Sequence, residues 1–277
     1  MFSRLFTIFV LAFWLVAMGW LVHHDIAPAW TAQDAPKFTP GDWLTERLAR
    51  SQARIENKYG QRVGTVWTEF DSRLSGVSRT DLIVLDNVPS FGEFGLPQPL
   101  KIFIEADYTT DGELDTFRLQ MLGYEKKIEL LGERYSGYLA FRLDIGAEMQ
   151  LFKVDASLAG MIADAFNPFP MLPAIEVGDS WRMHVVNPLA AITGVGQKLV
   201  PMLVTVTGKE TIDTFRGELE CFIVEAGGAK AWVDADGSVL QQEVDLPYGG
   251  RYTIIAEPYD ENLRVNIDLH STSSDTN

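Results

Sequence analysis

An uncharged apolar run spans residues 5–22, with Arg4 before it and His23, His24 and Asp25 after it. A helix of this length measures about 27 Å, close to the ~30 Å hydrocarbon core of a bilayer. The run therefore predicts an N-terminal transmembrane helix within residues 1–24. Its membrane-embedded side chains would include Leu5, Phe9, Phe13, Val16 and Trp20.

The charges beside this run indicate its orientation. Arg4 and the free N-terminus favour a cytoplasmic N-terminal tail, which places the rest of the chain outside the cytoplasm. We expect an uncleaved signal-anchor, and hence a single-pass protein of the bacterial inner membrane whose C-terminal domain lies in the periplasm. Two alternatives stay open: a cleaved secretory signal, for which residues 27–29 offer a small-x-small site, and a helix buried in a core.

The pattern then changes at residues 25–40, where three prolines predict a short, stiff spacer. Hydrophobic residues next follow helical spacing, which predicts a helix over about residues 41–53, started by Thr39 and Pro40. Beyond it strand-like alternation predominates. We expect one β-rich extracytoplasmic domain over residues 41–270 and a disordered tail, rich in Ser and Thr, over residues 271–277.

Alternation and turn residues predict an antiparallel meander in this domain. Two Asp-Gly pairs, at residues 111–112 and 236–237, are typical of tight hairpin turns. A bend is expected at 211–215. The predicted strands cover residues 54–59, 63–70, 82–85, 100–106, 117–122, 127–131, 138–143, 181–186, 199–207, 218–226, 230–233, 238–244, 252–257 and 263–269.

One segment interrupts the strand pattern. Apolar residues recur at helical spacing over 153–166, which predicts a helix ending before Pro168. An apolar loop pinned by prolines follows, and it is either buried against the sheet or a contact surface. The candidate contacts for a hydrophobic ligand or a partner are Val154, Leu158, Met161, Ile162, Phe166, Phe169, Met171 and Leu172.

Charge and cysteine content narrow the classes of function. The net charge is −15, so the surface repels phosphate backbones and anionic headgroups, and we expect no nucleic-acid partner. The domain should not lie flat on a bilayer either. Cys221 is the one cysteine, so no intramolecular disulfide forms, and its place in a predicted strand indicates a buried, inert thiol.

Signatures of catalysis are missing from the sequence. It contains no His-Glu-x-x-His, Gly-x-Ser-x-Gly, phosphate-binding glycine loop or Cys-x-x-Cys. Residues 234–237 begin like a calcium loop but continue as Ser-Val-Leu-Gln, so a hairpin turn is favoured. The acidic residues between 105 and 115 indicate a solvated face, with weak divalent-cation binding or a basic partner as the alternatives. We expect no catalytic residue, no cofactor and no metal site.

Several short motifs follow one another in order, at residues 59–64, 108–117, 172–181, 187–189, 204–212 and 232–240. Over residues 54–257 this series resembles the non-catalytic β-rich domain of bacterial transglutaminase-like exported proteins. It also resembles related stand-alone periplasmic domains, similar to lipoprotein-carrier half-barrels. The resemblance implies a long, curved antiparallel sheet, or half-barrel, that wraps one helix. The Cys-His-Asp core of those enzymes is missing, so their catalysis is not implied.

These observations favour a non-enzymatic, membrane-anchored extracytoplasmic protein with a binding or accessory role. Its ligand would be a lipid or another hydrophobic molecule, or its partner a protein. The alternative is an accessory subunit of a membrane complex such as a transporter, with the transmembrane helix as the docking element. A hydrolase with an unrecognised site is a minor alternative.

Overall fold

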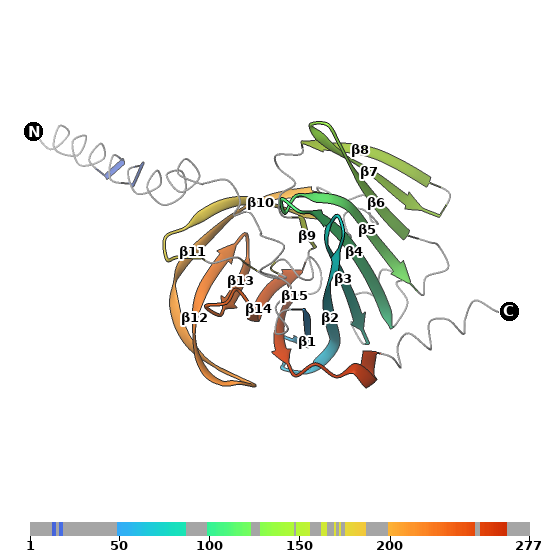
Figure 1. Ribbon diagram of the computed structural model, residues 1–277. Helices are drawn as coiled ribbons and strands as arrows, with labels where there is room; N and C mark the ends of the chain where they lie inside the picture. Colours follow the sequence, from blue (N-terminus) through green and yellow to red (C-terminus); the bar gives the residue numbers. More distant parts are fainter. Residues whose placement is uncertain are drawn as a thin grey trace, which may run out of the picture.

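The computed structural model describes residues 13–14, 17–18, 49–86, 99–122, 128–146, 148–155, 162–164, 169, 172, 175–186, 199–246 and 250–264. Fifteen strands form one sheet (Figure 1). They are β1 (Arg50–Asn57), β2 (Arg62–Arg73), β3 (Gly76–Leu85), β4 (Leu100–Thr109), β5 (Leu114–Leu122), β6 (Ile128–Tyr135), β7 (Tyr138–Ile145), β8 (Glu148–Asp155), β9 (Ile162–Asp164), β10 (Ser180–Val186), β11 (Leu199–Thr214), β12 (Gly217–Ala226), β13 (Ala229–Val233), β14 (Val239–Leu246) and β15 (Gly250–Glu257).

The strands follow one another through the sheet almost in sequence order. The order runs from β8 back to β1, continues from β1 to β15, and then runs back to β9. All neighbours are antiparallel except β9 and β10, which are parallel. Strands β8 and β9 are the two ends, so the sheet stays open although it is curved (Figure 1). The predicted mainly-β fold and antiparallel meander are confirmed.

Strand β4 shows how alternation builds the core. Every second residue from Leu100 to Tyr108 is buried. The register sets Ile102 beside Ile83 of β3 and Met121 of β5. Because cross-strand neighbours share a face, such positions form a continuous apolar surface on the inner side of the sheet.

The helix predicted over 153–166 is wrong where the structure describes the segment. Residues 153–155 belong to β8 and Ile162–Asp164 form β9. Val154 pairs with Leu139 of β7, so ladder hydrogen bonds hold this backbone extended. A short apolar run is compatible with both the helical and the strand period, and pairing with a neighbouring strand decides which of the two structures forms. Leu158, Met161 and Phe166 lie outside the described residues.

Three smaller predictions also fail in part. Residues 50–53, expected to be helical, lie in β1, which pairs with both β2 and β15. The expected bend at 211–215 is largely straight, since β11 continues to Thr214 after a bulge near Gly208. Leu263 and Arg264, expected in a strand, belong to a four-residue helix over 261–264. In the first two cases strand pairing overrides the local pattern.

The N-terminal apolar run is described at Phe13, Trp14, Ala17 and Met18, which are helical. Among the described residues no helix is long and apolar enough to cross a membrane. The rest of the run, with Leu5, Phe9, Val16 and Trp20, lies outside the described residues. The predicted spacer and C-terminal tail lie outside them as well.

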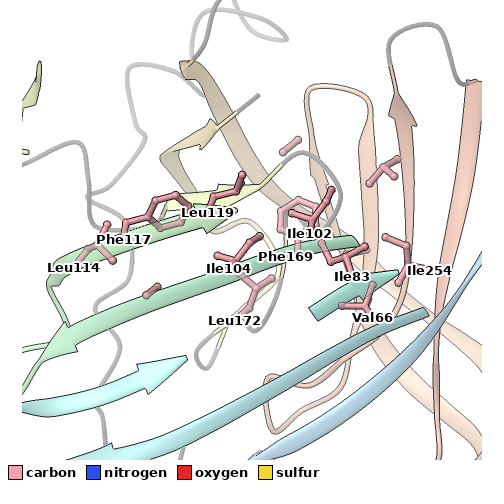
Figure 2. Close-up of a cluster of buried hydrophobic side chains, with 14 of the residues drawn as sticks. Val66, Ile83, Ile102, Ile104, Leu114, Phe117, Leu119, Phe169, Leu172 and Ile254 are labelled. Carbon is pink, nitrogen blue, oxygen red and sulfur yellow. The ribbon is translucent and has the colours of Figure 1, made fainter. Parts of the chain in front are cut away.

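The apolar segment between β9 and β10 enters the core. Phe169, Leu172 and Ile175 are buried in a cluster to which strands β1–β8 and β10–β15 contribute. Figure 2 shows Phe169 and Leu172 near the inner face of β3 and β4. The backbone N–H of Leu172 donates to the carbonyl oxygen of Gly237, 3.1 Å away. Of the two predicted placements, burial is therefore the observed one for these residues.

Candidate functional site

The sequence-predicted contact residues that are described do not form a surface. Val154, Phe169 and Leu172 are all buried in the main hydrophobic cluster. Ile162 lies in β9, while Met171 is outside the described residues. The inner side of the sheet is therefore occupied at these positions by the protein's own side chains. A ligand reaching this part of the interior would have to displace Phe169 or Leu172.

A charged pair lies within this apolar interior. Arg79 and Asp81 of β3 are buried, and the Arg79 Nε donates to Asp81 Oδ2 over 2.7 Å. The Thr68 hydroxyl donates to the other carboxylate oxygen over 2.6 Å. Burial raises the pKa of Tyr108, whereas the neighbouring Arg79 guanidinium opposes that rise. Hydrogen bonds from Thr68 and Arg79 thus satisfy both oxygens of the Asp81 carboxylate inside the core.

A pocket of about 200 Å³ opens where several strands end, and we name it the strand-end pocket. It is lined by the beginning of β1 (residues 50–52), the end of β15 and the turn after it (256–259), the β11–β12 turn (215–216), the start of β14 (238–240) and Phe70. These elements lie in the lower part of Figure 1. They come from distant parts of the chain, and the β1–β15 pairing brings them together.

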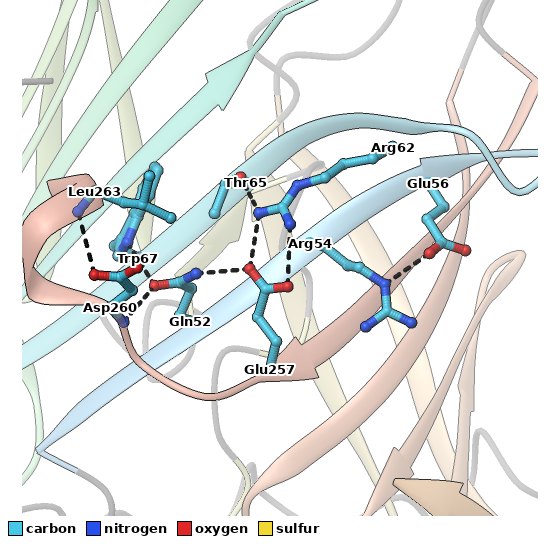
Figure 3. Close-up of polar contacts among 9 residues, drawn as sticks. All are labelled: Gln52, Arg54, Glu56, Arg62, Thr65, Trp67, Glu257, Asp260 and Leu263. Carbon is cyan, nitrogen blue, oxygen red and sulfur yellow. Dashed lines mark hydrogen bonds and ion pairs between the residues drawn. The ribbon is translucent and has the colours of Figure 1, made fainter. Parts of the chain in front are cut away.

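One wall of the strand-end pocket is fixed by a hydrogen-bond network on the outer face of the sheet (Figure 3). Gln52 donates to Glu257 over 2.6 Å, and its side-chain oxygen accepts from Trp67 Nε1 over 2.9 Å. Arg62 donates to both oxygens of the Glu257 carboxylate. The backbone N–H of Asp260 donates to Gln52 and so fixes the chain after β15. The network links β1, β2 and β15 across the seam of the sheet.

The opposite wall comes from the β11–β12 turn. The Arg216 guanidinium lies 5.0 Å from the Phe215 ring centre, and its nearest carboxylate oxygen, on Asp234, is 3.9 Å away. Its side chain donates no hydrogen bond to any described residue. The Ser238 hydroxyl is also buried without a hydrogen-bond partner in the described part of the chain. Two polar groups at this pocket thus have unused hydrogen-bonding capacity.

Arg50 and Tyr259 complete the mouth of the strand-end pocket. Arg50 reaches Glu261 at 3.5 Å and lies 6.0 Å from the Tyr259 ring centre. The Tyr259 hydroxyl donates to Glu69. Burial, helped by that hydrogen bond, raises the pKa of Tyr259 to about 12, so its hydroxyl stays uncharged at neutral pH. The mouth therefore carries the positive charge of Arg50 beside a neutral aromatic ring.

The other chemical candidates take structural roles. Burial raises the pKa of Cys221 to about 11, which leaves little thiolate at neutral pH. Asp234 and Asp236 each accept a backbone N–H within the β13–β14 turn, and Gly237 has a φ of 86°. The described residues contain no group of three or more His, Cys, Asp or Glu side chains placed to hold a metal ion.

The acidic residues between 105 and 115 are partly compensated by arginines. Arg73 lies 3.2 Å from Glu105 and 2.9 Å from Asp107. Arg134 lies 3.0 Å from Glu113. Asp111 and Asp115 are exposed. The arrangement matches the solvated face expected from the sequence.

Comparison with known proteins assigns this chain to no family. No family model matches it, and no curated protein is significantly similar. Among solved structures, a DUF1089 family protein from Pseudomonas aeruginosa is similar at 12% sequence identity, with a TM-score of 0.38. The similarity covers 63% of this chain and 87% of the other chain. A likeness this low supports no conclusion on fold or function, and the resemblance to transglutaminase-like exported proteins stays a prediction.

The strand-end pocket is not predicted by any pattern in the sequence. Arg216 and Ser238 sit in turns, where a polar residue is ordinary. Phe70 and Arg50 are far apart in sequence from both. The one available signal was the Phe215-Arg216 pair at a hairpin tip, since an exposed aromatic residue beside an arginine is common in binding surfaces.

Proposed function

We propose that the protein is a non-enzymatic, membrane-anchored extracytoplasmic binding protein that takes its ligand, or a group of its partner, in the strand-end pocket. Residues 5–22 would hold it in the membrane. The observation that carries this proposal is the pocket itself, about 200 Å³ between distant elements. Within the described residues, its Ser238 hydroxyl has no hydrogen-bond partner and its Arg216 guanidinium has only a 3.9 Å ion pair with Asp234. Binding sites are concave and combine apolar walls with a few polar groups. This pocket is concave and is lined by both polar and apolar side chains.

The filled interior supports placing the site at the strand ends. Phe169 and Leu172 occupy the inner side of the sheet that a lipid would need. At the strand ends, by contrast, a ligand meets Phe215, which is 46% exposed, and the half-buried Tyr259. Binding there requires no displacement of the core.

Photo-crosslinking tests the proposal on the full chain in its native membrane. A photoreactive phenylalanine analogue replaces Phe215 at the pocket or, as the matched control, Tyr59, which is 74% exposed in the β1–β2 turn at the opposite strand ends. We expect an adduct at position 215 only. A small mass increment identifies a ligand, and a protein-sized increment a partner. No adduct at 215, or equal adducts at both positions, would contradict the proposal.

A second candidate function is an accessory subunit of a membrane complex. Edge strand β8 favours it, since Met149 is 61% exposed and Leu151 is 71% exposed beside a ladder edge. Exposed apolar edge strands are sites of pairing with another chain. The photoreactive analogue at Leu151 would then capture a partner protein, while replacement of residues 5–22 by an unrelated anchor would abolish that capture if the helix is the docking element.

A further inference from the structure

We propose that the strand-end pocket selects a single anionic group joined to a compact apolar body, such as an aromatic or branched aliphatic carboxylate. This inference rests on the proposed binding function of the same pocket and adds the chemical class of the ligand. It follows from the unused donors, the local charge, and the size and lining of the pocket.

Arg216 is the principal anion-binding group. A guanidinium carries five N–H donors and binds carboxylates through two parallel hydrogen bonds. Here the nearest carboxylate oxygen is 3.9 Å away, beyond hydrogen-bond distance. Asp234, which carries that oxygen, already accepts the backbone N–H of Ala235 through its other oxygen. The side chain of Arg216 is 26% exposed, so its donors are accessible while water competes only partly.

Ser238 supplies a second group at the same pocket. Its hydroxyl oxygen is buried and has no hydrogen-bond partner in the described part of the chain. A buried hydroxyl without a partner loses free energy that a ligand oxygen would restore. The backbone N–H of Ser238 is already bonded to Asp236, so the residue is held in position by its turn.

The lining of the pocket contains more cationic than anionic side chains, although the sequence as a whole is acidic. The whole sequence carries a net charge of −15. The lining contains two cations, Arg50 and Arg216, and one carboxylate, Glu257. Glu257 is ion-paired with Arg62 and accepts a hydrogen bond from Gln52 on the outer face. Asp234 and Glu261, the carboxylates nearest the two lining arginines, lie outside the lining. An anion entering the pocket therefore meets two guanidinium groups whose charge Asp234 and Glu261 offset in part. Within an acidic surface this favours small, singly charged ligands.

The volume of the pocket limits the size of the apolar part of the ligand. Cavities of about 150 Å³ bind benzene, and this pocket measures about 200 Å³. Phe70, Leu240 and the Tyr259 ring form its apolar lining. One ring or branched chain with a carboxylate fits this space, whereas a full acyl chain exceeds it. Both a free metabolite and the C-terminus of a polypeptide present this chemistry.

The test measures binding of defined probes to the full-length protein in nanodiscs of zwitterionic lipid, by saturation-transfer NMR. The probes are 3-phenylpropanoate and its neutral isostere, 3-phenylpropanamide. An Ala-Ala-Phe tripeptide, with a free or an amidated C-terminus, distinguishes a chain end from a free small acid. We expect the carboxylate to bind about tenfold more tightly than the amide, because a charge-assisted pair of hydrogen bonds is lost in the amide.

Two variants and one control show whether Arg216 and Ser238 are responsible for the preference for carboxylate. Arg216→Gln at the exposed hairpin tip should abolish the preference for carboxylate, and Ser238→Ala should weaken carboxylate binding a few-fold. Arg251→Gln is the matched control, since Arg251 is an exposed, ion-paired arginine at the other end of β15. It should leave both affinities unchanged. Circular dichroism of each variant confirms that the fold is retained.

The outcomes separate this inference from the function on which it rests. Equal binding of carboxylate and amide, or equal losses in Arg216→Gln and Arg251→Gln, would overturn the anionic class while leaving the pocket as a binding site. If neither probe binds but an adduct still forms at position 215, the proposed anionic class of ligand is overturned and the binding function is not. Loss of that adduct overturns the binding function itself.

Discussion

At the scale of single residues, Arg79 and Asp81 are two charged side chains inside the otherwise largely apolar core. Both side chains are buried, and Thr68 and Arg79 together satisfy the Asp81 carboxylate. Such a pair contributes little net stability compared with apolar residues of the same volume, but removing one member leaves an uncompensated buried charge. The hydrogen bond from Thr68 of β2 to Asp81 of β3 also connects the two strands through their side chains at this point.

Asp81→Ala should destabilise the protein by about 3–5 kcal/mol, because Arg79 would remain buried without its partner. Urea unfolding of the full chain, followed by tryptophan fluorescence, measures this. The double variant Arg79→Met with Asp81→Leu should recover much of the loss. Asp245→Ala, which removes the exposed partner of Arg251, should change stability by less than about 1 kcal/mol. A similar small effect for Asp81→Ala would refute the expected role.

At the scale of elements, Gly132 in β6 is a packing position. A Cβ there would lie 2.6 Å from a ring carbon of Phe141 and 3.3 Å from Phe117. The Phe141 ring stacks on Phe152 of β8 at 5.2 Å between centres. The missing side chain thus admits the ring that connects β6, β7 and β8. This explains why a glycine, unfavourable in strands, occupies the middle of one.

Gly132→Ala should destabilise the protein by about 1–3 kcal/mol, since the added methyl group overlaps the Phe141 ring. Differential scanning calorimetry of the full chain gives the change. Gly208→Ala is the matched control, because no atom lies within 4 Å of the added Cβ, and it should stay within about 0.5 kcal/mol. Combining Gly132→Ala with Phe141→Leu should restore part of the stability. Equal effects of the two glycine substitutions would disprove the packing argument.

At the scale of the whole molecule, the two halves of the sheet share one core. Strands β1–β8 and β10–β15 join at the β1–β15 seam, and the buried residues between β9 and β10 pack against both halves. Leu172 reaches the β13–β14 turn through its backbone, while its side chain lies in the common cluster. We therefore expect the described domain to unfold as one unit.

Leu172→Ala should destabilise the protein by about 2–5 kcal/mol, through lost burial and a residual cavity. Far-ultraviolet circular dichroism and tryptophan fluorescence should report the same midpoint, since both halves depend on this residue. Leu151→Ala, on the exposed edge strand, should change stability by less than about 0.5 kcal/mol. Two separate transitions in the Leu172→Ala variant would show that the halves unfold independently.

Local sequence features determined most of the described strands and the Asp-Gly turns of this protein. Alternating apolar residues and Asp-Gly pairs are local signals, and the expected hairpin at residues 54–70 and the two Asp-Gly turns occur as predicted. The burial of Cys221 also followed from its strand. These features depend on side-chain period and backbone conformation within a few residues, which a sequence displays directly.

Tertiary structure alone decided which strands meet and what lies between them. Residues 153–155 are extended because β7 pairs with them, although their spacing suits a helix. Arg79 and Asp81 are buried although their charges suggest exposure. The strand-end pocket exists because β1 pairs with β15, which brings residue 50 near residues 216, 238 and 259. Long-range pairing sets the environment of each residue, and no local pattern encodes a partner some two hundred residues away.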